Sequence, residues 1–247
     1  MAGHSKWKQI KHYKAATDAK RGAQFTKLIR EITMAAKLGG GDPAGNPRLR
    51  TAIDAAKAKS MPKENIERAI RKGTGDLEGV NYTEITYEGY GPGGVAILIF
   101  TLTDNPTRTV ADIRHRLSRL GGNLGASHSV SYLFERKGQI YIDGANYHED
   151  AVLEAALDAG AEDFKAEDDQ FVVTTDPQSL HAVQKALEVS GYKAVESEIA
   201  HIARTTVHVE GKNAESLVKL LEELEDLDDV QKVAANFDMD VEQMSGA

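Results

Sequence analysis

The sequence of 247 residues contains no cysteine, and its longest apolar run extends only from Val95 to Leu102. A chain without cysteine has no thiol nucleophile, no redox dithiol and no zinc ribbon. The apolar run is far shorter than the roughly 18 residues that cross a bilayer, and it is typical of a buried strand. The N-terminus lacks the apolar region of a secretory signal, and Ala2 stands where a myristoylated glycine would be needed. We therefore expect a cytoplasmic protein with no membrane partner.

The common catalytic and metal-binding motifs are also absent. The glycine-rich segment 89–94 lacks the Lys-Ser/Thr of a P-loop, and segment 125–129 lacks the last glycine of a nucleophile elbow. The eight histidines show no HExxH pattern and no paired ligand spacing. We therefore predict that the protein is not an enzyme, and that it has no catalytic residue, no cofactor and no metal.

The charges are divided very unevenly along the chain. Its net charge is −8, but residues 1–75 contain 17 Lys and Arg against 6 Asp and Glu, a net charge of +11. Residues 76–247 contain 13 Lys and Arg against 32 Asp and Glu, a net charge of −19. Because salt screens charges beyond about 10 Å, the first segment creates its own positive field. The sequence indicates a basic module joined to an acidic body.

Helical periodicity predicts a small all-α domain over residues 1–75, preceded by a lysine-rich arm at 1–16. Three helices are expected, from Thr17 or Asp18 to Leu38, from the Asn46-Pro47 cap to about Lys59, and from about Pro62 to Gly73. On the first helix, basic residues fall on the face opposite the apolar ones. They are Lys20, Lys27, Arg30 and Lys37.

After Gly75 the composition changes to β-branched and aromatic residues, which marks a domain boundary. The elements expected between residues 139 and 199 follow the order βαββαβ of a ferredoxin-like fold. Without this block, segments 95–134 and 205–235 give the same order again, with Glu84–Glu88 as an extra edge strand. We predict an α+β protein with an N-terminal three-helix domain followed by two ferredoxin-like α+β domains, one inserted into the other. The predicted domains are 1–75, 76–135 plus 204–247, and the insert 136–203.

Several short motifs, in this order, are similar to those of a known family. They are AGHSKW at 2–7, DAKR at 18–21, LGGGDPAGNP at 38–47, YEGYGPGG at 87–94, TDNPTRT at 103–109, GGNLG at 121–125 and LEELEDLDDV at 221–230. They resemble the YebC family, which includes bacterial proteins described as probable transcriptional regulators and the mitochondrial translational activator of cytochrome oxidase. The resemblance covers nearly the whole chain. It implies three domains, α and α+β, and nucleic-acid binding without a known catalytic activity.

Two positions depart from the family pattern. Tyr13 stands where many members have a basic residue, which weakens the basic arm slightly. His128 stands where a glycine usually precedes Ser129-Val130, which puts a tight turn there in doubt.

The basic module is the main candidate site. Flexible lysines that release counterions, together with aromatic side chains that stack on unpaired bases, are typical of nucleic-acid binding. The alternative is a solvated helix face with a tail. Because no recognition-helix pattern is visible, the module favours single-stranded or structured RNA over a duplex groove. The candidate residues are His4, Ser5, Lys6, Trp7, Lys8, Lys11, His12 and Lys14 in the arm, and Lys20, Arg21, Lys27, Arg30 and Lys37 in the helix.

A second candidate site is the loop 104–109 and the helix after it. Arg108 is expected in the first turn of that helix, where its charge opposes the helix dipole, as an anion site would require. Alternatively, Asn105 and Pro106 simply begin the helix and Arg108 lies in solvent. Arg116 adds positive charge further along the helix.

The acidic run 222–229 is interpreted as a solvated helix end and loop. Its alternatives are repulsion of nucleic acid from the body, or binding of a basic ribosomal protein.

These observations predict a non-enzymatic regulator of gene expression. Its partner would be ribosomal RNA on the ribosome, or promoter DNA. The charge of the module does not distinguish the two, because phosphate contacts carry no sequence information. A ligand-sensing ferredoxin-like module and a nucleotide-dependent enzyme are the alternative hypotheses. The sequence does not determine the oligomeric state, and a monomer is compatible with it.

Overall fold

The computed structural model describes residues 18–167 and 170–239, so the predicted arm lies outside the described residues. The first three described helices pack around one apolar core formed by Ile32, Leu49, Ile66 and their neighbours. They are α2 (Asp18–Gly39), α3 (Pro47–Ala58) and α4 (Lys63–Thr74). We call these helices the helical unit. Each begins and ends within one residue of its predicted bounds, so the N-terminal helical prediction is confirmed.

Asn46 explains why the second helix begins where it does. Its side-chain oxygen accepts a hydrogen bond from the Leu49 N–H at 3.1 Å, which caps α3. Its side-chain amide donates to the carbonyls of Ala35 at 2.8 Å and Gly40 at 2.9 Å. One buried side chain therefore joins the end of α2 to the start of α3.

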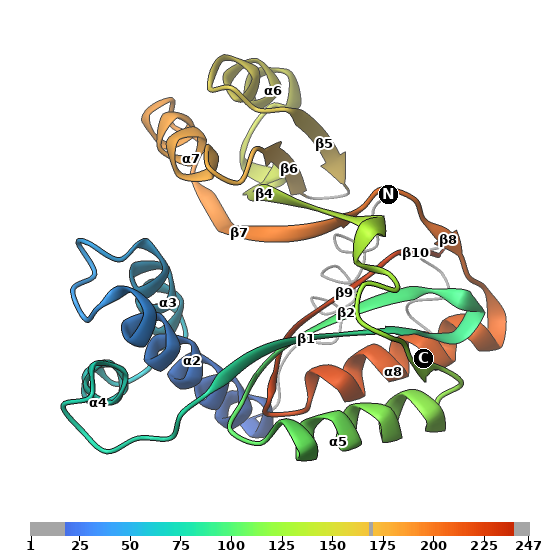
Figure 1. Ribbon diagram of the computed structural model, residues 1–247. Helices are drawn as coiled ribbons and strands as arrows, with labels where there is room; N and C mark the ends of the chain where they lie inside the picture. Colours follow the sequence, from blue (N-terminus) through green and yellow to red (C-terminus); the bar gives the residue numbers. More distant parts are fainter. Residues whose placement is uncertain (1–17, 168–169, 240–247) are drawn as a thin grey trace.

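A four-stranded antiparallel sheet with two helices on one face follows the helical unit (Figure 1). Ile97 and Ile99 face these helices, whereas Ala96 and Leu98 face the opposite side of the sheet. The central strand is therefore buried on both faces, as its continuous apolar sequence predicts. The strands, in the order β3-β1-β2-β9, are β3 (Asn123–Leu124), β1 (Thr83–Tyr90), β2 (Ala96–Thr103) and β9 (Val230–Ala235), and the helices are α5 (Pro106–Arg119) and α8 (Gly211–Glu225).

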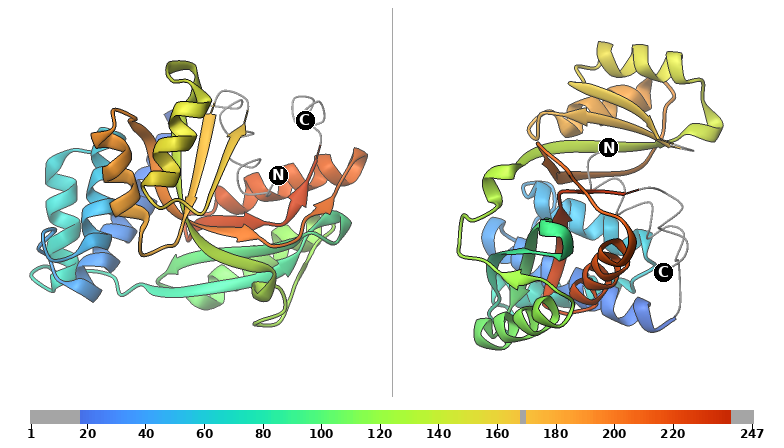
Figure 2. Two further views of the ribbon diagram at one scale, coloured as in Figure 1. Left: turned by 90° about the horizontal axis from the view of Figure 1, so that it is seen from above. Right: turned by 90° about the vertical axis from the view of Figure 1, so that its right-hand side faces the viewer.

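A second antiparallel sheet is inserted into the chain of the first and stands beside it (Figure 2). Its helices, α6 (Glu149–Asp158) and α7 (Leu180–Val189), cover one face over a separate apolar core. The strand order β5-β6-β4-β7 is that of a ferredoxin-like sheet. The strands are β4 (Phe134–Asp143), β5 (Asp163–Glu167), β6 (Gln170–Thr175) and β7 (Ala194–Ala203). The predicted fold class, with its inserted unit, is confirmed. The boundaries assigned to the domains stay a prediction.

The first sheet differs from the expected strand assignment. Segment 205–235 was expected to add two strands to this sheet, with Glu84–Glu88 as an extra edge strand, but β1 lies between β3 and β2 and pairs with β2 along its whole length. β8 (Val207–His208) instead pairs in parallel with β10 (Phe237–Asp238). The reason is local: only a short turn at 91–95 separates β1 from β2, so their pairing closes a much smaller loop. The remaining short helices are η1 (Pro92–Gly94), η2 (Ser131–Leu133) and η3 (Gly144–Asn146).

The loop between β3 and β4 is held by the buried carboxylate of Glu88. This carboxylate accepts hydrogen bonds from the backbone N–H groups of His128 at 2.8 Å, Val130 at 2.7 Å and Ser131 at 2.9 Å. Burial by itself raises the pKa of Glu88, but these hydrogen bonds outweigh it and leave the pKa below its usual value. His128 has a φ of 65°, so the tight turn that its side chain put in doubt is present.

Replacing His128 with glycine is expected to raise the free energy of unfolding by about 0.5–1 kcal/mol, because glycine adopts the left-handed region without steric cost. The imidazole is exposed, so little packing is lost. Thermal unfolding should show a melting temperature higher by about 2 °C. The matched control is Ser127→Gly, an exposed neighbour without a positive φ, which should lower the melting temperature. An equal decrease in both variants would contradict the argument.

Candidate nucleic-acid interface

The helical unit is attached to the α+β body through polar contacts. The apolar cluster of the helical unit is confined to residues 25–70, and the clusters of the body begin at residue 87. Within the described residues, no apolar cluster contains members of both parts. The relative position of the two parts therefore depends on charged side chains.

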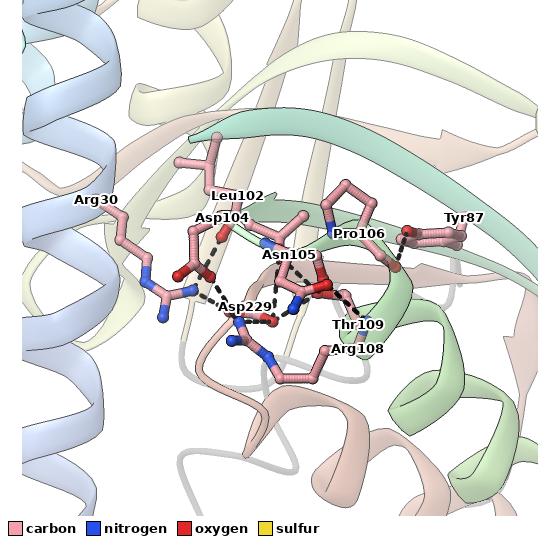
Figure 3. A network of polar contacts seen from close by, with 10 residues as sticks. Arg30, Tyr87, Leu102, Asp104, Asn105, Pro106, Arg108, Thr109 and Asp229 are labelled. Carbon is pink, nitrogen blue, oxygen red and sulfur yellow. Dashed lines mark hydrogen bonds and ion pairs between the residues drawn. The ribbon is translucent and has the colours of Figure 1, made fainter. Parts of the chain in front are cut away.

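Arg30 of α2 is the centre of this attachment (Figure 3). Its guanidinium is paired with the carboxylate of Asp229 and donates to the carbonyl of Leu102 at 2.9 Å. It also lies 5.4 Å from the centre of the Tyr82 ring. The side chains of Arg30 and Asp229 are only 12% and 8% exposed. Arg30 therefore lies at an internal junction, whereas the helical pattern predicts it on a basic solvent face.

Arg108 reaches the same carboxylate from the first turn of α5. Its guanidinium donates to both oxygens of Asp229, at 3.0 and 2.8 Å, and to Asp104 at 2.7 Å (Figure 3). Asn105 caps the helix by accepting the backbone N–H of Arg108 at 3.1 Å. Asn105 and Pro106 begin the helix, and Arg108 is 45% exposed, but two carboxylates of the same chain bind its guanidinium.

Asp229 corrects the interpretation of the acidic run. It was expected in a solvated loop, but it is buried and also accepts a hydrogen bond from the Thr109 hydroxyl at 2.6 Å. Burial raises the pKa of its carboxyl, while Thr109 and the two arginines lower it more strongly, so the pKa lies below its ordinary value. Asp229 acts as an internal anion for two cations that are distant in the sequence.

Other members of the acidic run also contact predicted binding residues. The Lys27 ammonium donates to the backbone carbonyl of Glu225. Arg116 lies 3.4 Å from the carboxylate of Glu223, which Arg119 also pairs with. A helical pattern shows which face of a helix is polar, but it does not show which other segment lies against that face.

The other predicted site residues are placed as follows. Lys20 and Arg21 lie in the first turn of α2, where the structure describes the helix but not their side chains. Lys37, at the other end of α2, is exposed and donates to the side-chain oxygen of Asn81 at 3.0 Å. The arm residues His4, Ser5, Lys6, Trp7, Lys8, Lys11, His12 and Lys14 lie outside the described residues.

The structure adds a group of basic residues that the sequence analysis did not select. They are exposed on α3, on α4 and on the turn between them: Lys57, Lys59, Lys63, Arg68, Arg71 and Lys72. Lys57 is 3.6 Å from Asp54, and Lys63 is 3.4 Å from Glu67. The other four make no ion pair with any residue in 18–167 or 170–239. The net charge of segment 1–75 was the signal that could have found them.

The described residues contain neither a membrane-spanning helix nor a cluster of metal ligands. None of the described helices is both long and apolar enough to cross a membrane. The same residues contain no group of three histidine, aspartate or glutamate side chains placed to hold a metal ion.

The geometry defines an α+β protein with a basic helical unit attached by ion pairs to a two-sheet body. Comparison with known families agrees with this architecture over nearly the whole chain. The model described as "TACO1/YebC protein N-terminal domain" matches residues 5–76, and "TACO1/YebC second and third domain" matches residues 82–237. The chain belongs to the TACO1/YebC family.

Individual relatives are similar over their full length. A protein of Gemmatimonas aurantiaca named "Probable transcriptional regulatory protein" is 63% identical over 247 residues, which is 100% of each chain. A protein of Citrifermentans bemidjiense with the same name is 56% identical over 244 residues, 99% of this chain and 98% of that one. The crystal structure of a conserved hypothetical protein from Aquifex aeolicus has a TM-score of 0.83 at 48% identity, covering 90% of this chain and 92% of that chain. The family is thus one whose members are named as regulatory proteins.

Proposed function

We propose that the protein is a non-enzymatic regulator of gene expression that binds nucleic acid through the helical unit and the arm before it. The observation that carries this proposal is the group of exposed basic side chains on α3 and α4. These side chains are separate from the cations that the acidic body neutralises. The helical unit therefore keeps a positive surface although the whole chain has a net charge of −8.

The ion pairs of the basic residues support α4 as the binding surface. Arg30, Arg108 and Arg116 are paired with carboxylates of the body, so their charge is largely used within the molecule. Arg71 and Lys72 lie three and four residues after Arg68 on α4, which places all three on one side of the helix. A phosphate backbone that contacts this side would release counterions without breaking an internal ion pair.

The kind of nucleic acid is a separate question. The printed names of the relatives favour promoter DNA and transcription. The arm, in which Trp7, His12 and Tyr13 alternate with lysines, favours unpaired RNA and a place on the ribosome. Sedimentation with purified ribosomes, with duplex DNA as competitor, distinguishes the two. Retention that duplex DNA does not displace supports ribosomal RNA, and displacement by particular DNA sequences supports transcription.

Replacing Arg68 and Arg71 together with glutamine is expected to weaken nucleic-acid binding about tenfold. For each lost phosphate contact, the slope of log K against log salt concentration should become shallower by about 0.7 for single-stranded RNA and by about 0.9 for duplex DNA. The measurement is fluorescence anisotropy with a labelled single-stranded RNA and a labelled DNA duplex over a salt series. The control is Lys212→Gln with Lys219→Gln, which removes the same charge from exposed positions of α8. An equal loss in both double variants would show that only net charge matters, and would contradict a surface on α4.

A further inference from the structure

A cavity of about 230 Å³ lies between the C-terminal parts of α2 and α4. The segment 79–82, which leads into β1, forms its third wall. Lys37 of α2 and Lys72 of α4 both line it, and no aspartate or glutamate is among the described residues that do so. Two lysines thus line one cavity, and no carboxylate residue is among its described lining residues.

Close helix packing fixes the two lysines relative to one another. A Cβ atom on Gly73 would lie 2.3 Å from the carbonyl oxygen of Thr33 and 2.7 Å from the Ala36 Cβ, so α4 touches α2 here without space for a side chain. Lys37 directly follows Ala36 on α2, and Lys72 directly precedes Gly73 on α4. The relative position of the two helical walls of the cavity is therefore determined by close backbone packing.

Neighbouring polar groups leave the positive charge of the cavity in place. Lys37 donates to the neutral side-chain oxygen of Asn81 at 3.0 Å. Asp76, just beyond α4, accepts a hydrogen bond from the Thr74 hydroxyl at 2.6 Å and is not among the lining residues. An anion in the cavity would meet two cations and an amide, whereas a cation would meet repulsion from both lysines.

We propose that this cavity binds a phosphate group of nucleic acid, with Lys37 and Lys72 as its charged ligands. The inference rests on the proposed function and assigns a particular phosphate contact within it. The volume equals that of several water molecules at about 30 Å³ each, which is room for a phosphate. Arg68 and Arg71 continue the positive charge from Lys72 along α4, so a strand with one phosphate in the cavity can follow the helix. That continuity favours a polynucleotide over a free anion.

The test measures one double variant, Lys37→Gln together with Lys72→Gln, against the double control Lys212→Gln together with Lys219→Gln. The control removes equal charge from exposed positions of α8, outside the helical unit. Binding of a labelled single-stranded RNA should weaken about tenfold in the cavity variant, with a smaller salt slope, and less than twofold in the control. In the wild type, amide NMR signals of Gly73, Gly75 and Asn81 should shift on addition of the RNA.

Each opposite result overturns a defined part of the argument. If the wild type binds the RNA and the cavity variant binds it equally well, the phosphate site is wrong while the proposed function stands. If the wild type binds no RNA or DNA, the proposed function itself fails. If inorganic phosphate or a mononucleotide competes at concentrations far below those that screen the RNA, the cavity is a site for a free anion. A lower melting temperature with unchanged affinity would show that the lysines only complement the helix dipoles.

Discussion

Replacing Asp229 with alanine is expected to lower the free energy of unfolding by about 3 kcal/mol, because it leaves two arginines without their carboxylate. Arg30 is the more important of the two, since its side chain is only 12% exposed and water cannot easily replace the lost partner. Arg108 is 45% exposed and keeps its contact with Asp104, so its share of the loss is smaller. The Thr109 hydroxyl also loses an acceptor.

Thermal and urea unfolding measure this effect. For a chain of this size, a loss of about 3 kcal/mol corresponds to a melting temperature lower by about 6–12 °C. The matched control is Asp228→Ala, which removes the same charge from the exposed neighbouring residue and should change the melting temperature by less than about 2 °C. Similar changes in the two variants would show that the junction does not stabilise the fold through Asp229.

The Asp229 carboxylate gives the stability difference between wild type and Asp229→Ala a defined pH dependence. The pKa of Asp229 is lowered in the folded protein, so its stabilising contribution is complete above the ordinary aspartate value of about 3.9. It is lost as the pH falls through the lower folded pKa. The stability difference between wild type and Asp229→Ala should therefore be constant near neutral pH and decrease below about pH 4.

The second large effect is expected for Glu88→Gln, which should lower the free energy of unfolding by about 3 kcal/mol. The two oxygens of Glu88 accept three backbone N–H groups, and hydrogen bonds to a charged acceptor are the stronger ones. Glutamine offers one oxygen, and its amide would place N–H groups against backbone donors. The loop 128–131 would lose partners in a buried position.

Amide hydrogen exchange gives a local readout of this change. The amides of Val130 and Ser131 should exchange faster in Glu88→Gln, and the melting temperature should decrease. The control is Glu84→Gln on the same strand, where an exposed carboxylate 2.5 Å from Arg48 is worth about 1 kcal/mol or less. Because the pKa of Glu88 is also lowered, its contribution too is lost only as the pH falls below about 4. Unchanged exchange at Val130 would contradict its role in holding the loop.

Two helix caps and one strand assignment show what the sequence predicts and what it does not. Asn46-Pro47 and Asn105-Pro106 predict two helix starts, and both are confirmed with side-chain caps. These signals work because a cap involves residues only three positions apart. The assignment of the first strand of segment 205–235 to the first sheet is wrong for the opposite reason: strand pairing joins segments distant in the sequence, and pattern alone does not choose the partner.

The sequence by itself determined the helical unit, the doubly buried strand, the inserted ferredoxin-like unit and the separation into a basic and an acidic part. Each of these depends on local periodicity or on composition, which a linear pattern contains. The tertiary structure alone decided which charges neutralise each other. Arg30 and Arg108 meet Asp229 across 199 and 121 residues of chain, and no local spacing encodes such a meeting. It arises because the packing of α2 and α5 against the loop before β9 brings one carboxylate between two guanidinium groups, and the basic side of α4 is left facing solvent.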